Sequence, residues 1–163
     1  MGHFAELDSD NIVLRVLVFS NDHINANGGD LSIGAEQWVS TTPATTAEES
    51  ITGKPGVAWK QTSMNKNFRV NFAGVGGKYD SINDKFINRK PFDSWILQED
   101  GTWQSPIGPA PTNPLIGNAP EYSQWWDEEN QRFLRFRIAD SIPRTNYVWN
   151  TSNSEWEVIN LDG

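Results

Sequence analysis

The chain has 163 residues, no Cys, and 21 Asp and Glu against 13 Lys and Arg, a formal charge of −8. These values exclude disulfides and thiolate metal sites, and they disfavour a nucleic-acid partner because the net charge repels a phosphate backbone. Only 37% of the residues are apolar but eight are Trp, so we expect a core that depends on a few large rings.

The first residues, Met1-Gly2-His3-Phe4, lack the basic and apolar stretches of a signal peptide, and no run of about 18 apolar residues follows. We therefore expect a protein made in the cytoplasm, without membrane insertion. Residues 4–7 and 12–19 flank a polar turn and predict a β-hairpin. The second strand is apolar on both faces except at Arg15, which favours a central position in a sheet.

Residues 21–58 are rich in Gly, Ser, Thr, Asn and Ala and predict a long insertion. Within it, Glu48 and Glu49 favour a short helix from about 45 to 51, because acidic side chains stabilise the first turn of a helix. Residues 58–62 and 68–72 flank another polar loop and predict a second hairpin.

An eight-residue unit recurs at residues 79–86, 126–133 and 149–156, and a looser copy spans 95–103. Each unit starts and ends on an aromatic residue, and in the three closer copies Asp or Asn follows the first ring. Such a side chain accepts hydrogen bonds from backbone amides two residues on, while the rings pair across the strands. One such pair adds roughly 0.2–1 kcal/mol, so the hairpins must share a core or dock on a partner.

Prolines separate these units, most densely over residues 105–121, where they favour extended connectors. We therefore expect an N-terminal β domain over 1–104, a linker over 105–121 and a C-terminal module of aromatic hairpins over 122–163. The predicted fold class is all-β, with antiparallel sheets built from successive hairpins and little or no helix.

No motif predicts catalysis, a metal or a cofactor. His3 and His23 are the only histidines, too few for an imidazole zinc site. The Asp8-Ser9-Asp10-Asn11 run lacks the Gly and the closing Glu of a calcium loop. Glycines at 74, 76 and 77 precede no helix that would face a phosphate, so we interpret them as a bend. The acids at 99–100 and 127–129 occupy hairpin tips, where we expect surface positions.

Aromatic residues of the C-terminal module are the candidate binding residues. Trp125 and Trp126 must point to opposite sides of any strand that contains both, so one of them is a candidate for exposure. We favour a core or subunit interface over a platform for glycan stacking, because cross-strand pairing already accounts for several rings. The candidates are Tyr122, Trp125, Trp126, Trp149 and Trp156.

Several motifs together resemble small, mostly uncharacterised proteins of marine tailed phages, cyanophages among them. The resemblance covers most of the chain and departs over residues 21–58 and in the additional Trp hairpins near the C-terminus. It implies a phage gene product. The motifs are residues 1–8 and 11–16, Trp59-Lys60-Gln61-Thr62-Ser63, Asn67-Phe68-Arg69, Phe72-Ala73-Gly74, Tyr79-Asp80 and Pro91-Phe92-Asp93-Ser94-Trp95.

These observations favour a non-enzymatic accessory protein of the virion, with capsid decoration ranked ahead of other sites. Its partners would be capsid or tail subunits or further copies of itself. A tail-fibre module that binds host glycan through Trp125 and its neighbours Tyr122 and Trp126 is the alternative. A virion-associated hydrolase ranks last, because no pair of acids is placed for catalysis. We also expect Trp149→Ala or Trp156→Ala to weaken incorporation into particles while folding survives.

Overall fold

The computed structural model describes residues 1–42 and 58–161, so the helix expected over 45–51 lies outside the described residues. The fold is mostly antiparallel β, as predicted, with two short helices. The chain divides into two compact units: Met1–Lys90 with Gln98–Thr102, and Pro91–Leu97 with Trp103–Gly163. We expected a separate linker over residues 105–121 from its prolines, whereas in the structure these residues belong to the second unit.

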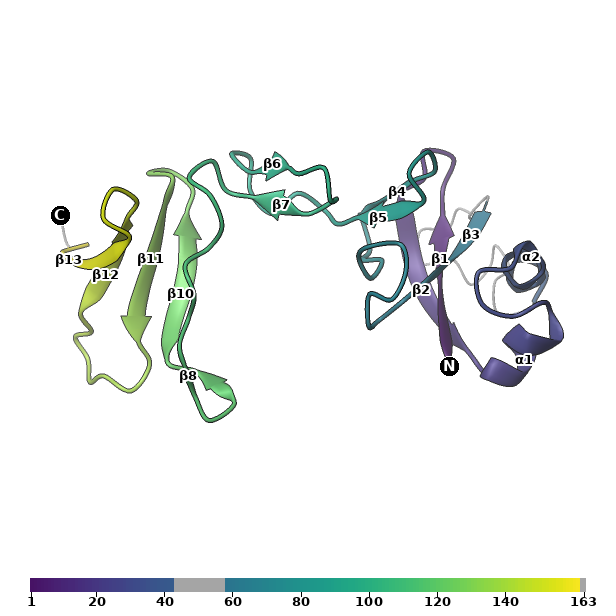
Figure 1. The fold of residues 1–163 in the computed structure, drawn as a ribbon, viewed down its shortest axis with the longest axis horizontal. Coiled ribbons are helices and arrows are strands. Elements are labelled where there is room, and N and C mark those ends of the chain that lie inside the picture. The colour runs from purple at the N-terminus through teal and green to yellow at the C-terminus, as the bar shows by residue number, and fades with distance from the viewer. Residues whose placement is uncertain (43–57, 162–163) are drawn as a thin grey trace. The chain divides into compact units, whose positions relative to one another are not determined.

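The first unit contains a three-stranded antiparallel sheet in the order β2-β1-β3 (Figure 1). The predicted opening hairpin is confirmed as β1 (Gly2–Leu7) and β2 (Val13–Phe19). The central strand is β1 and not β2, so that part of the prediction is wrong. The apolar side chains of β1 are fully buried, whereas Val18 of β2 is 49% exposed, which suits β2 to an edge.

The hairpin predicted over residues 58–72 is not formed. Its first half is β3 (Ala58–Thr62), which pairs with β1. Its second half forms no strand, because Arg69 and Val70 have φ angles of 56° and 60°, far from extended backbone. This conformation accompanies an inward Arg69 side chain, which donates to the carboxylate of Glu36 and to the carbonyl of Gln61.

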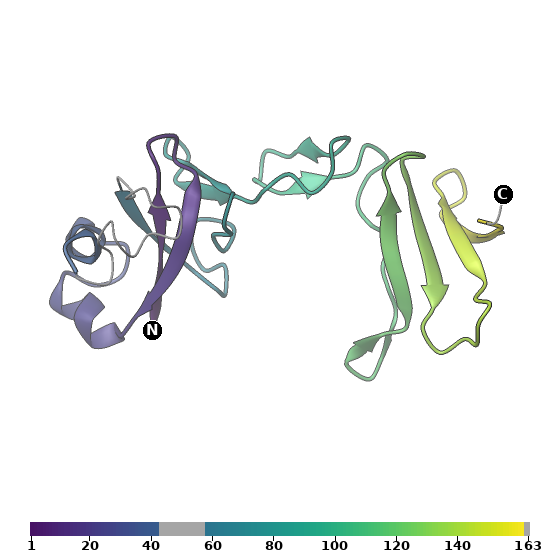
Figure 2. The same cartoon turned by 180° about the vertical axis from the view of Figure 1, so that it is seen from behind.

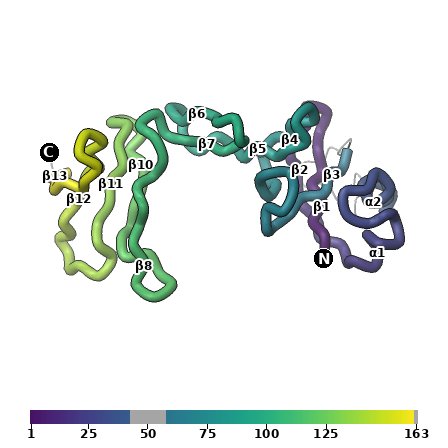
Figure 3. The backbone as a smooth tube through the Cα atoms, viewed as in Figure 1, coloured from purple at the N-terminus to yellow at the C-terminus, as the bar shows by residue number. Residues whose placement is uncertain are grey.

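Two helices that the sequence did not predict lie within the segment expected as a long insertion: α1 (Asn21–Ala26) and α2 (Ile33–Ser40). Each begins after a serine, Ser20 or Ser32, whose hydroxyl accepts a backbone N–H of the first turn. Figure 3 shows both helices beside the sheet of the first unit. Neither helix is long or apolar enough to cross a membrane, nor is any other in the described part of the chain.

The core of the first unit consists of two clusters. One joins the helices to the sheet, and its buried members are Phe4, Ile24, Ala35, Val39 and Trp59. The other joins the sheet to the hairpin of β4 (Lys78–Asp80) and β5 (Lys85–Ile87), through Ala5, Leu7, Val13, Ala73, Tyr79 and Phe86. Phe4 and Ala5 enter different clusters because successive side chains of a strand point to opposite faces.

The second unit contains a four-stranded antiparallel sheet in the order β10-β11-β12-β13, seen from behind in Figure 2. Two small hairpins accompany it. Of the described apolar side chains in this unit, only those of Trp126, Phe133 and Leu134 are less than a tenth exposed. The strands are β6 (Ile96–Leu97), β7 (Trp103–Gln104), β8 (Leu115–Ile116), β9 (Ala119–Pro120), β10 (Tyr122–Asp127), β11 (Arg132–Arg137), β12 (Asn146–Asn150) and β13 (Glu155–Ile159).

The repeated eight-residue unit forms a hairpin at all three closer copies, and its rings pair as predicted. Ring centroids lie 5.2 Å apart for Tyr79–Phe86, 4.8 Å for Trp126–Phe133 and 5.3 Å for Trp149–Trp156. The polar side chain after the first ring accepts a hydrogen bond from a backbone N–H of the turn. Asp80 accepts from Ile82, Asp127 from Asn130, and Asn150 from Ser152.

The repeat also has a backbone signature that the sequence analysis missed. The sixth residue of each copy has a positive φ: 47° at Asp84, 48° at Gln131 and 57° at Ser154. The fifth residue is Asn each time, at 83, 130 and 153. Since one left-handed residue closes this type of hairpin turn, the three copies share one turn geometry.

Candidate functional site

The register of the four-stranded sheet assigns the candidate rings to its two faces. Trp126 lies opposite Phe133, and Trp149 lies opposite Trp156. Because side chains alternate along each strand, one face carries most of the rings. We call this the ring face; it comprises Tyr122, Trp126, Phe133, Tyr147, Trp149 and Trp156, with Arg135 among them. Trp125 lies on the other face, as expected for a neighbour of Trp126.

Trp126 is a core residue of the second unit and is 6% exposed. Its ring lies against Phe133 and at 6.2 Å, edge-on, from Trp95. Its indole N–H donates to Glu128 Oε2 at 2.6 Å. Glu128 also accepts from the backbone N–H and the hydroxyl of Ser94, both at 2.7 Å. Although we expected Glu128 to be a surface acid, it joins the 91–97 segment to the sheet.

Arg135 occupies the centre of the ring face. Its guanidinium carbon lies 3.9 Å from the ring centroid of Tyr122 and 4.2 Å from that of Trp156, within the range of cation–π attraction. Burial lowers the pKa of Arg135 from its ordinary value, against the raising effect of nearby Tyr and Glu side chains. Tyr122 and Trp156 are therefore already stacked on a cation within their own sheet. Sequence reasoning missed Arg135, although alternation along β11 places it opposite Gln124 and Tyr147.

Trp125 packs on the face opposite the ring face. Its ring lies 5.8 Å from that of Phe136, over which Arg144 sits at 4.6 Å. The platform of Tyr122, Trp125 and Trp126 considered for glycan stacking is therefore divided between two faces of the sheet. Of the five candidates, the structure brings four together on one face.

An aromatic pocket of about 560 Å³ lies within the second unit. No charged side chain lines it among the described residues. Trp95 Nε1 and Gln124 Oε1 are buried without a hydrogen-bond partner in the described structure, whereas Gln124 Nε2 donates to the carbonyl of Pro111 at 2.9 Å. The lining residues are Phe92, Trp95, Ala110, Pro111, Asn113, Gln124, Trp125, Trp126 and Phe133.

The first unit contains a buried network of charged groups around Glu36. One carboxylate oxygen accepts from Arg69 at 2.6 Å and from the backbone N–H of Gln61, and the other accepts from Lys60 at 2.8 Å. Arg69 also binds Asp84, whose carboxylate accepts from the hydroxyl of Tyr79. Burial and this hydrogen bond raise the pKa of Tyr79 above its ordinary value. The network joins α2 to β3 and to the first repeat, a structural role.

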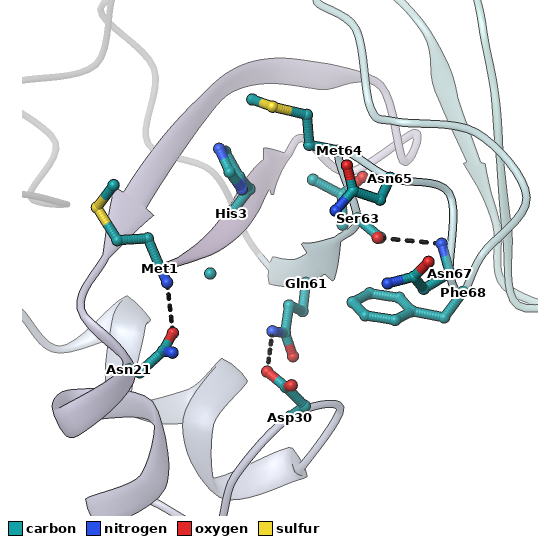
Figure 4. Close-up of a pocket in the computed structure, with 12 residues that line it drawn as sticks. Met1, His3, Asn21, Asp30, Gln61, Ser63, Met64, Asn65, Asn67 and Phe68 are labelled. Carbon is teal, nitrogen blue, oxygen red and sulfur yellow. Dashed lines mark hydrogen bonds between the residues drawn. The ribbon is translucent and has the colours of Figure 1, made fainter.

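A second hollow, of about 470 Å³, lies in the first unit between β1, β3 and the helical segment (Figure 4). Two of its polar side chains, Gln61 and Asp30, pair with each other. Gln61 Nε2 donates to Asp30 at 2.6 Å, and Gln61 Oε1 accepts the backbone N–H of Leu31. His3 lines this hollow and packs edge-on against Phe72 at 5.3 Å. Gln61 and Asp30 are therefore paired within the protein, without a ligand.

The remaining motifs have local roles. Asp8 accepts the amides of Asp10 and Ile12 in the first turn. Gly77 is packed so closely that an added Cβ would lie 2.9 Å from two carbonyl oxygens, which explains why glycine occupies this position. At Asp127, hydrogen bonds from Arg132 and Asn130 outweigh burial and lower the pKa of the carboxyl group. The described residues contain no cluster of three His, Asp or Glu side chains placed for a metal ion.

Comparisons with protein-family models, with curated proteins and with solved structures find no match to this chain. The functional argument therefore depends on the second unit itself, on its ring face, its aromatic pocket and its exposed apolar side chains.

Proposed function

We propose that this chain is a non-enzymatic accessory protein of a phage particle, and that its second unit attaches it to other virion proteins. The capsid surface is the preferred location, ahead of the tail. The phage origin rests on the resemblance described above, and the mode of attachment rests on the second unit.

The observation that carries the proposal is how few apolar side chains the second unit buries. Three of them are buried, whereas nine large ones are exposed among its described residues, Ile142 at 84% and Val158 at 72% among them. Val158 follows Trp156 on the ring face. Since a hairpin assembly needs an apolar face to pack against, and exposed apolar side chains mark interaction surfaces, a protein partner would complete this unit.

The location is tested by mass spectrometry and electron microscopy of gradient-purified particles. We expect the protein at a fixed copy number, and its absence from particles would refute the proposal.

The attachment surface is tested with Ile142→Lys and Val158→Lys, which place a charge at exposed positions of the second unit. We expect lower incorporation into particles and an unchanged melting temperature of the free protein. Ile82→Lys is the matched control, because Ile82 is 92% exposed in the first unit. If Ile142→Lys and Val158→Lys were incorporated as well as Ile82→Lys, the attachment surface would not include Ile142 or Val158.

A further inference from the structure

The aromatic pocket of the second unit has the size and lining of a small-ligand site. Its volume of about 560 Å³ lies within the range of roughly 300–1,000 Å³ that such sites occupy. Five rings line it, and the side-chain amides of Asn113 and Gln124 provide its polarity. We propose that this pocket binds a neutral sugar residue of a polysaccharide through Trp95 and Gln124.

The rings provide the stacking surface. Phe92 and Trp95 lie 5.5 Å apart, and Trp95 meets Trp126 edge-on. Aromatic faces carry negative potential, which attracts the C–H groups on the flat side of a pyranose ring. Phe92, Trp95 and Trp125 are half-buried, in contrast to the buried Trp126 and Phe133. Of the three, Trp95 also carries the unpartnered N–H, so we assign the stacking to Trp95.

Two unpartnered polar atoms define the chemistry of the ligand. Trp95 Nε1 needs an acceptor and Gln124 Oε1 needs a donor. A hydroxyl group donates and accepts, so sugar hydroxyls satisfy both. Both atoms are shielded from solvent in this structure, so binding includes a side-chain rotation, a common change at binding sites.

Other ligand classes fit less well. Proline-rich peptides also dock on aromatic grooves, but proline has no N–H to donate to Gln124. An ion would lose its hydration with no charged side chain in the lining to replace it. The uncharged lining of rings and amides therefore selects a neutral polyol over a peptide or an ion.

This inference goes beyond the proposed function. Attachment to a particle uses exposed apolar side chains such as Val158, whereas the pocket recognises a small polar ligand. The protein can therefore attach and bind no sugar, or bind sugar and be absent from particles, and the experiments distinguish these cases.

The test titrates full-length, ¹⁵N-labelled protein with cellotetraose, mannotetraose and galactotetraose, and follows the indole N–H signals. We expect at least one of these sugars to shift the Trp95 signal and to bind in the millimolar range. Gln124→Met removes the acceptor and should weaken binding by about tenfold or more. Trp95→Phe retains a ring, loses the N–H, and should weaken binding as well. Trp149→Phe, outside the pocket, should bind like the wild type.

Three outcomes would overturn the inference. In the first, none of the neutral sugars shifts the Trp95 signal. In the second, a proline-rich peptide or acidic oligosaccharides bind more tightly than every neutral sugar. In the third, Gln124→Met retains the wild-type amide spectrum and the wild-type affinity.

Discussion

Trp126→Ala tests whether the second unit depends on its buried rings. Removing a buried Trp side chain costs about 3–5 kcal/mol. Losing the indole hydrogen bond to Glu128 adds up to about 1.5–3 kcal/mol, because a charged acceptor is involved. A unit of about 65 residues has an unfolding free energy of roughly 3–10 kcal/mol. We therefore expect Trp126→Ala to leave much of the second unit unfolded.

Two further variants separate the contributions. Trp126→Phe retains one ring between Phe133 and Trp95 but loses the indole N–H and part of the buried ring volume, so we expect a loss of about 2–4 kcal/mol, smaller than in Trp126→Ala. Trp149→Ala removes a half-buried ring and should cost less than Trp126→Ala. If Trp126→Ala and Trp149→Ala lowered the unfolding free energy equally, burial of the ring would not decide the size of the loss.

The assay is urea unfolding followed by amide NMR signals, which report on each unit separately. Signals of the first unit should keep their wild-type midpoint in Trp126→Ala. If this variant lowers the unfolding free energy of the second unit by less than about 1 kcal/mol, the assignment of Trp126 to the core of this unit is wrong.

Three other variants test the first unit and the turns. Glu36→Gln leaves Arg69 buried with less counter-charge and should cost about 3 kcal/mol in urea unfolding, and adding Arg69→Met should recover part of this loss; no recovery would contradict the pairing. Gln131→Val puts a β-branched residue at φ 48° and should lower stability by about 1–2 kcal/mol, whereas Glu129→Val in the same turn should stay within about 0.5 kcal/mol. The lowered pKa of Asp127 means that its stabilising effect is complete above the ordinary Asp pKa, about 3.9, and is lost as pH falls through the folded-state value. Thermal melts between about pH 6 and pH 2 should therefore show a smaller acid loss in Asp127→Asn, and an unchanged slope would refute this assignment.

The candidate site was predictable only in part. Tyr122 and Trp126 share a face because side chains alternate along a strand, whereas Trp149 and Trp156 join them on that face through the register of the sheet. The contacts of Tyr122 and Trp156 with Arg135 depend on which strands become neighbours. The aromatic pocket was missed because Trp95 and Gln124 are 29 positions apart in the chain, and no local pattern connects them.

The sequence by itself determined the hairpins of the three closer repeat copies, at residues 79–86, 126–133 and 149–156. An Asp or Asn after a ring, and a second ring seven positions later, act through hydrogen bonds and contacts within eight residues. Closing so short a loop costs little entropy. These interactions are therefore present in the sequence before any tertiary contact forms.

Tertiary structure decided the strand order and the arrangement of the 58–72 segment. β3 pairs with β1 across more than fifty residues, which no short-range signal encodes. Arg69 leaves extended backbone because Glu36, 33 residues away, offers a buried carboxylate. Burying a charge is costly unless it is paired, so the ion pair overrides the strand propensity of the neighbouring apolar residues.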